Sequence, residues 1–433
     1  MMMVVFTLLL SLGFRPAQAQ DPIVFDLGTA LEIALSDNPT VKVAESEIEK
    51  KGYAKKGAYA SLFPQIDFSA SYNRTLKKQT MVMMGESFQI GTDNNYSLGF
   101  NAVMPLINAQ LWKSLSISAL DVELAVEQAR SSKIDMVNLV TKSYFNVMLA
   151  KDSYKVLQES LNNAIENYMD VKQKYDQGLV AEYDLIRADV SVKNIEPTVF
   201  QAENALVLAK WQLKALLALD LELNIDVQED LNDYESQLYG DYLALQTNLD
   251  QNTTLRQIDI QGEQLKESLT MQKYEYLPTL SVNTNYNWTA MANDFKFNQY
   301  NWNPYSMIGF TLSVPIFSGG SKYNNIRQTR VSIDQLRWQR EDTERNLQLA
   351  VKQQMDNMQT NIKQYDAARK GVEQAEKGYI IAQKQYETGA GTLLELNDAE
   401  LAMTQARLNF NQSIYDYMVA KADLQQLIGN NEF

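Results

Sequence analysis

The sequence predicts a mixed α+β membrane protein. Four β-strands per chain are expected to belong to a barrel, which a long antiparallel α-helical coiled coil continues. Three observations lead to this fold class: segments of alternating polarity, long stretches without glycine or proline, and an internal tandem repeat. The chain has 433 residues but only 18 glycines and 9 prolines, and this scarcity favours long, uninterrupted helices.

The composition excludes several classes of function. The chain has no histidine and no cysteine, which excludes the usual zinc sites, Ser-His-Asp and Cys-His catalysis, disulfides and iron–sulfur clusters. A net charge of −14 is unsuited to binding a phosphate backbone. The sequence also lacks a Walker-type phosphate loop, so self-powered transport is not expected. We therefore expect no cofactor, no metal site, no nucleic-acid partner and no enzymatic activity.

Residues 1–20 are predicted to be a secretory signal peptide. An apolar run over residues 4–14 precedes Ala17-Gln18-Ala19, a small-x-small pattern that places cleavage near Ala19 or Gln20. The lack of a basic residue before the apolar run is atypical, since the first positive charge is Arg15. The alternative, a membrane-spanning helix, would need about 20 apolar residues. We therefore expect the protein to be exported.

The rest of the chain is predicted to be a duplication. The sequence YDQG at 175–178 aligns with YETG at 386–389, and the same offset pairs Leu185 with Leu396. Such self-similarity is the mark of a repeated structural unit. The two repeats run from about 62 to 217 and from about 277 to 428.

Each repeat begins with two segments in which apolar and small polar residues alternate. Period two over about ten residues is typical of a membrane β-barrel strand. A strand of a soluble sheet has the same local pattern, but its apolar face would need a covering layer. The apolar positions are Ile66, Phe68, Ala70 and Tyr72, then Tyr96, Leu98, Phe100, Ala102 and Met104, then Leu280, Val282, Thr284, Tyr286 and Trp288, and finally Ile308, Phe310, Leu312 and Val314.

Polar loops over 74–95 and 289–304 are expected to join the two strands of each pair. The second loop and its borders carry four aromatic residues: Trp288, Tyr300, Trp302 and Tyr305. Aromatic residues at strand ends suit the membrane interface. An ordinary core role for them is the alternative.

The segments that follow the strands predict helical hairpins too long for a globule. Residues 106–177 contain neither glycine nor proline, and a helix of 65–70 residues is roughly 100 Å long. Apolar residues at heptad spacing predict a coiled coil, and Pro197 lies off this seam. The hairpins are expected to turn at Gly178 and Gly389. The first seam is Tyr154, Leu157, Leu161, Ala164, Tyr168, Val171 and Tyr175; it recurs 211 residues later, and similar seams follow 185–216 and 396–427.

These patterns divide the chain into eight segments. They are a signal peptide (1–20), an N-terminal helical segment (21–61), β-hairpin 1 (62–105), helical hairpin 1 (106–217, tip near 178), a connecting equatorial segment (218–276), β-hairpin 2 (277–317), helical hairpin 2 (318–429, tip near 389) and a short C-terminal tail (430–433). Four strands cannot close a membrane barrel, which needs at least about eight, and an open edge is costly in lipid. Copies of the chain must therefore pool their strands, and two, three or four copies would give 8, 12 or 16.

With these features the chain resembles the outer membrane efflux protein family, the TolC-like channels. The resemblance covers the whole mature chain and rests on the duplicated strand–strand–helical hairpin and on both tip motifs, YDQGLVAEYD at 175–184 and YETGAGTLLELNDA at 386–399. The ending LQQLIG at 424–429 also fits. The resemblance implies a homotrimer with a twelve-stranded barrel in the outer membrane and a periplasmic helical tunnel. It further implies a passive duct for efflux or type I secretion, with a periplasmic adaptor and an inner-membrane pump as partners.

The resemblance also implies roles for residues at the tips. Glu395 and Asp398 match the acidic constriction ring of the family, and Tyr386 and Asp184 match two of its latching residues. The latch arginine falls on Gly391, which departs from the family pattern. A plainer role for Glu395 is a capping box with Thr392.

Two functions from other classes compete with the channel. One is a secreted, soluble coiled-coil scaffold, which leaves the four alternating strands unexplained. The other is a barrel-bearing enzyme such as an outer-membrane hydrolase, which would lack a histidine base.

Overall fold

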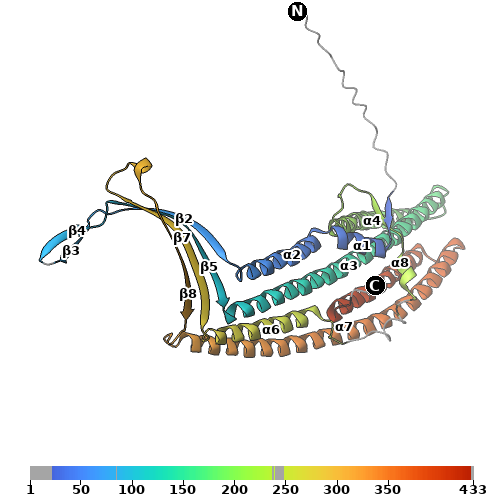
Figure 1. Cartoon of the computed structure of the whole chain (residues 1–433). Coiled ribbons are helices and arrows are strands. Elements are labelled where there is room, and N and C mark those ends of the chain that lie inside the picture. The colour runs from blue at the N-terminus through green and yellow to red at the C-terminus, as the bar shows by residue number, and fades with distance from the viewer. Residues whose placement is uncertain (1–21, 84, 237, 239–247, 431–433) are drawn as a thin grey trace, which may run out of the picture. The chain divides into compact units, whose positions relative to one another are not determined.

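The computed structural model describes residues 22–83, 85–236, 238 and 248–430 (Figure 1). The predicted signal peptide lies outside the described residues, as do the last three residues of the predicted tail. The chain divides into two compact units. The helical unit comprises Met1–Lys42, Ser132–Gln251 and Leu347–Phe433, and the sheet unit comprises Val43–Ser131 and Asn252–Asn346. Each unit is considered by itself.

Helices make up most of the described chain. The two longest, α3 and α7, each contribute residues to both units. Within the described residues, none of the helices is long and apolar enough to cross a membrane. The helices are α1 (Leu27–Asp37), α2 (Pro39–Ala60), α3 (Ala109–Asp176), α4 (Glu182–Leu216), α6 (Thr253–Tyr274), α7 (Ser321–Glu387) and α8 (Leu393–Ile428), with short 3-10 helices η1 (Leu231–Tyr234) and η2 (Phe297–Gln299).

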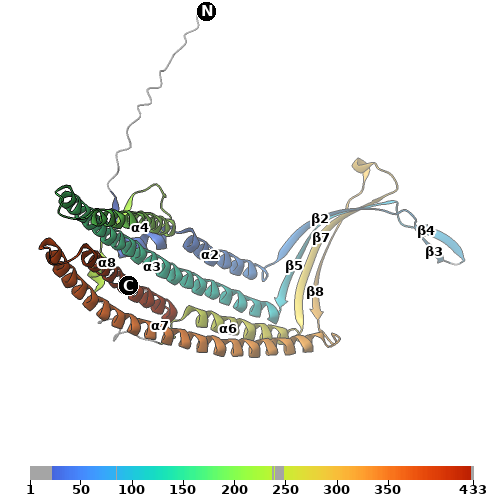
Figure 2. The same ribbon diagram turned by 180° about the vertical axis from the view of Figure 1, so that it is seen from behind.

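The sheet unit is built on one four-stranded antiparallel sheet. Its strands are β2 (Gln65–Arg74), β5 (Asn94–Ile107), β7 (Thr279–Ala292) and β8 (Asn303–Ser313), in the order β2-β5-β7-β8. They lie side by side in both views (Figures 1 and 2). Among the strands that the structure describes, the two middle ones pair on both sides, whereas β2 and β8 each pair on one side only.

The register places the predicted apolar residues of all four strands on one face of the sheet. Phe68 lies opposite Phe100, which lies opposite Tyr286, and the rings of the first two are 5.1 Å apart. On the edge strand β8, Phe310 and Leu312 are 68% and 65% exposed. The end of the apolar face around Tyr96 and Ala290 is buried, and the rest of this face is half-buried or exposed within the described chain. The predicted alternation is confirmed.

The other face is polar and crowded by asparagines. Asn101 donates to the Ser69 hydroxyl and Thr311 to Asn283. Gly99 lies opposite Asn287, whose carboxamide oxygen would be only 1.7 Å from a Cβ at that position. Glycine at 99 therefore makes room for the asparagine side chain across the strand.

The region predicted as a polar loop over 74–95 is instead partly a second hairpin. Strands β3 (Gln79–Met83) and β4 (Glu86–Ile90) pair antiparallel across Gly85, whose φ of 89° is left-handed. Met81 and Phe88 are paired across the hairpin and about half exposed. The run of methionine and valine in 81–83 does not resemble a loop in composition, and the loop assignment was wrong there.

The helical unit contains the coiled-coil seams. In both views α4 lies beside α3 and α8 beside α7 (Figures 1 and 2). The seam residues of these helices are buried or half-buried, except Tyr175, which is 37% exposed. Val171 and Tyr365 have no exposed surface. The predicted heptad pattern is thus confirmed, and Pro197 is contained within an unbroken α4.

A short parallel strand pair lies against the core of this unit. Strands β1 (Ile23–Phe25) and β6 (Ile225–Val227) pair in register, although both were predicted as parts of helical segments. The buried Tyr144 of α3 donates its hydroxyl to the Phe25 carbonyl at 2.9 Å. Tyr365 of α7 hydrogen-bonds to Glu235 from the equatorial segment. The Leu231 amide of the equatorial segment also donates to the Asp152 carboxylate of α3 at 3.2 Å, so the equatorial segment is bound to both long helices.

Candidate functional site

The tips of the two helical hairpins carry the residues that the sequence analysis singled out. Each hairpin turns on a glycine in the left-handed region, with φ of 74° at Gly178 and 75° at Gly389. The amide of each glycine donates to a carbonyl three residues earlier. A side chain would be strained at either position, because L residues rarely adopt this conformation.

The two tips are packed together by a small apolar cluster. Val171 of α3, Ala188 of α4 and Leu393 of α8 are its buried members, and Tyr386 at the end of α7 packs against them. The cluster therefore contains residues of both hairpins. Tyr386 is in the position that the family resemblance assigns to a latch.

Lys174 is the cation that contacts Tyr386. Its ammonium group lies 4.5 Å from the centre of the Tyr386 ring, a cation–π distance, and 2.7 Å from the Asp170 carboxylate one turn back on α3. Burial is the main reason that the pKa of Tyr386 is raised, and the charges of Asp170 and Asp184 add to it. Asp184 is thus close enough to act on Tyr386 through its charge. The sequence analysis did not identify Lys174.

Gly391 occupies the position where the family resemblance leads us to expect an arginine. A Cβ there would lie 3.0 Å from the Cβ of Gln385 and 3.3 Å from its carbonyl carbon. The Gly391 amide also donates to the Gln385 carbonyl at 2.9 Å. The turn is therefore too tight to take a side chain without shifting, which gives a physical reason for the absence of arginine.

Glu395 forms a capping box at the start of α8. The Thr392 amide donates to the Glu395 carboxylate at 2.8 Å, and the Glu395 amide donates to the Thr392 hydroxyl at 3.3 Å. The Thr392 amide and hydroxyl both donate to the Glu395 carboxylate and hold its pKa below the usual value of 4.5, so the carboxylate stays ionised in mildly acidic solution. The capping role considered from the sequence is present.

Asp398 is exposed one turn further along α8 and lines a groove between α4 and α8. In the single chain, Glu395 and Asp398 are three residues apart on one helix, so they share a face. Further from the tip, Arg407 of α8 bridges the other long helices, bonding to Glu159 of α3 and Glu376 of α7.

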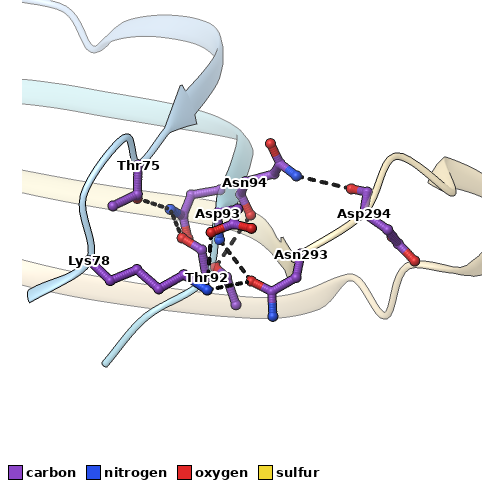
Figure 3. Close-up of polar contacts among 8 residues, drawn as sticks. Thr75, Lys78, Thr92, Asp93, Asn94, Asn293 and Asp294 are labelled. Carbon is purple, nitrogen blue, oxygen red and sulfur yellow. Dashed lines mark hydrogen bonds and ion pairs between the residues drawn. The ribbon is translucent and has the colours of Figure 1, made fainter. Parts of the chain in front are cut away.

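A second polar site joins the loops at one end of the sheet (Figure 3). The Asn293 side-chain oxygen accepts from Lys78 at 3.1 Å and from the Asp93 amide at 2.9 Å. Lys78 also pairs with Asp93 at 3.0 Å, and Asn94 donates to the Asp294 carbonyl. Residues flanking the β3–β4 hairpin are thus fastened to the β7–β8 loop. The sequence feature from which this polar site could have been predicted is the run of threonine, aspartate and asparagine residues at 92–95.

The aromatic residues of the β7–β8 loop pack around Tyr96. The rings of Phe297 and Tyr300 lie 5.0 and 5.4 Å from the Tyr96 ring, and Trp302 lies 6.5 Å away. Tyr96 is 9% exposed. These aromatics form a cluster at the end of the apolar face.

Comparison with known proteins gives one consistent result. The family model described as "Outer membrane efflux protein" matches residues 30–219 and 244–430. "Outer membrane protein TolC" of Vibrio cholerae is 22% identical over 400 residues, covering 92% of this chain and 89% of the relative. "Alkaline protease secretion protein AprF" of Pseudomonas aeruginosa is 20% identical, covering 95% and 85%.

Solved structures share the fold. The Campylobacter jejuni CmeC outer membrane channel superposes with a TM-score of 0.75 at 21% sequence identity, covering 93% of this chain and 85% of that one. Identity at this level establishes the fold and leaves the roles of individual tip residues to be tested.

Proposed function

The chain belongs to the outer membrane efflux protein family, and from this premise we propose that it forms the outer-membrane duct of a tripartite efflux or type I secretion system. The family is one of channels in the outer membrane with a large periplasmic part. The duct itself is passive. A periplasmic adaptor and an inner-membrane pump are its proposed partners, and the pump supplies the energy.

The observation that carries this proposal is the four-stranded sheet. One face is apolar; its side chains are exposed along β2 and β8 and mostly half-buried or exposed along β5 and β7. Within the described chain, the edge strands β2 and β8 each pair on one side only. A backbone edge cannot face lipid without large cost. Three copies joined from β8 to β2 would close a twelve-stranded barrel. A secreted, soluble scaffold would instead leave the apolar face in water, which disfavours that alternative.

Oligomeric mass tests the proposed assembly directly. We expect the mature protein in mild detergent to have the protein mass of three chains, since one four-stranded sheet cannot close by itself. Light scattering coupled to size exclusion, corrected for bound detergent, measures this mass. A variant with proline at Phe310 in the edge strand β8 should yield smaller species, because proline cannot donate a ladder hydrogen bond. A stable monomer with a protease-resistant sheet in lipid would contradict the proposal.

We further propose that the helical tips form the periplasmic gate. In the single chain both tips meet at Tyr386. There Lys174 supplies the positive charge that an arginine in place of Gly391 would have supplied. Opening a gate at this position requires the α7–α8 tip to part from the α3–α4 tip, and that movement breaks the contact between Lys174 and Tyr386. Lys174 would therefore stabilise the closed state.

Replacing Lys174 with methionine is expected to favour the open gate about fivefold, because a partly exposed cation–π contact contributes roughly 1 kcal/mol. The methionine keeps the apolar stem against Tyr386. Conductance of single channels in planar bilayers measures the open fraction. Lys172→Met, on an exposed position of the same helix, is the matched control. Equal conductance of the two variants would show that Lys174 does not latch the tips.

A further inference from the structure

A groove of about 700 Å³ lies between α4 and α8, and α3 also contributes to its walls. Its size is in the range of sites that bind small molecules. Apolar side chains form part of the lining, among them Leu157, Ile195, Leu401 and Leu408. All of its lining residues belong to the helical unit.

Two buried polar groups in this lining have unmet hydrogen-bonding capacity. Glu400 is 4% exposed; Ser160 and Asn163 hydrogen-bond to its carboxylate, but its Oε1 atom has no partner among the described residues. Thr404 lies one turn further along α8 and is 7% exposed, and its hydroxyl has no partner in the described part of the chain either. A buried carboxylate oxygen without a donor is costly and rare in native proteins. A donor that enters the groove would satisfy both groups.

The charges around the groove favour a cation. Asp398 adds a second carboxylate to the lining, and none of the described residues that line the groove is a lysine or arginine. Arg407, further along α8, is already bound to Glu159 and Glu376. Burial raises the pKa of Tyr379 on α7, and the charges of Glu400 and Glu166 add to this effect. This tyrosine is therefore neutral at physiological pH and does not balance the carboxylates.

We propose that the α4–α8 groove binds a small organic ammonium ion. The ammonium group donates hydrogen bonds to Glu400 and Thr404, and the apolar body of the ligand lies against the leucine and isoleucine side chains. Asp398 belongs both to this lining and to the proposed constriction, but the two groups that hold the ammonium ion, Glu400 and Thr404, are not part of the proposed gate. A neutral molecule of the same shape would fill the apolar part but leave the carboxylate without a charged partner.

Protonation of Glu400 competes with this ligand. Burial raises the pKa of Glu400 to about 7, even though its hydrogen bonds from Asn163 and Ser160 act in the opposite direction. In the free protein near neutral pH, a large share of this carboxyl is therefore protonated. An ammonium ion binds the ionised form, so its binding displaces the proton. Affinity should rise as the pH increases through this pKa and level off above it.

Isothermal titration calorimetry with benzylammonium on the full mature chain in detergent tests the site. We expect benzylammonium to bind at least about tenfold more tightly than benzyl alcohol, because a charged hydrogen bond contributes roughly 1.5–3 kcal/mol, and benzoate not to bind. Titration at pH 6.5 in buffers with different ionisation enthalpies should reveal proton release. Glu400→Gln should abolish both the preference for the ammonium ion and the proton release.

Two further variants distinguish binding in the groove from effects of a substitution elsewhere on the protein. Glu373→Gln removes an exposed carboxylate of α7 outside the groove and should leave binding unchanged. Ala205→Phe fills the groove from an exposed position of α4 and should prevent binding without altering Glu400. This variant still tests the site if Glu400→Gln does not assemble. Equal affinity of the unmodified protein for benzylammonium and benzyl alcohol, a preference for benzylammonium retained in Glu400→Gln, binding retained in Ala205→Phe, or no binding to the unmodified protein would each overturn the proposal.

Discussion

Replacing Phe310 or Leu312 with arginine is expected to destabilise the assembled protein by about 2–4 kcal/mol per substitution if the site lies near the middle of the bilayer. Both side chains lie on the apolar face of β8 and are more than 60% exposed in the single chain. In the proposed barrel that face contacts lipid, where a guanidinium group loses its hydration. Urea titration of folding into lipid vesicles, followed by gel mobility, measures the free energy of unfolding.

Thr311→Arg is the matched control, because Thr311 lies between the two sites on the same strand but on the polar face, where it donates to Asn283. There an arginine would extend into the water-filled lumen. We expect a loss of less than about 1 kcal/mol for this variant. If Thr311→Arg were as damaging as Phe310→Arg, the assignment of the apolar face to lipid would be wrong.

Neutralising the acidic residues after the second tip is expected to remove most of the cation selectivity of the channel. In the proposed trimer, three copies each of Glu395 and Asp398 surround one axis, and six carboxylates there would attract cations and repel anions. In the double variant Glu395→Gln/Asp398→Asn, the preference for potassium over chloride should approach unity. Block by a trivalent cation should weaken at least about tenfold. Reversal potentials and blocker titrations in planar bilayers measure both effects.

The capping box makes a second variant necessary, because Glu395 also stabilises the start of α8. Thr392→Ala removes the hydroxyl that accepts from the Glu395 amide but keeps both carboxylates, at a cost of about 1 kcal/mol to helix stability. Its selectivity at pH 7 should match that of the unmodified channel. The Thr392 amide, which the variant keeps, and the Thr392 hydroxyl, which it loses, both donate to the Glu395 carboxylate and lower its pKa. Without the hydroxyl, selectivity should be lost at a slightly higher pH than in the unmodified channel as the solution is acidified. If Thr392→Ala alone removed selectivity and block at pH 7, capping would account for the role of Glu395.

The parts of the fold that depend on local periodicity were predictable. Alternation in β2, β5, β7 and β8 is readable within about ten residues of sequence, and the heptad seams of the long helices are readable over about three or four heptads. The family assignment is also confirmed. Strands β1 and β6 were missed because each has only three residues and its partner lies about 200 residues away, so no local pattern identifies it.

The candidate site was predictable only in part. Turn glycines and the Thr392–Glu395 box are visible from local spacing, but the contact between Lys174 and Tyr386 joins two helices far apart in the sequence. Lys174 is also one of many lysines on helix surfaces, and nothing in its neighbours distinguishes it. Glu400 was missed because a glutamate beside a seam position is ordinarily solvated, and only the packing of α3 against α8 buries it. The roles of Glu395, Asp398 and Asp184 stay predictions.

The unpaired sides of β2 and β8 also have a consequence for heredity and biogenesis. If a closed barrel needs three intact chains, its insertion depends on the concentration of chains at the membrane. At low concentration the chains would remain uninserted. A cell making equal amounts of intact and edge-damaged chains would assemble only roughly one fully intact trimer in eight. Alleles that damage either edge would therefore be dominant over the normal allele, whereas alleles that abolish the chain altogether would be recessive.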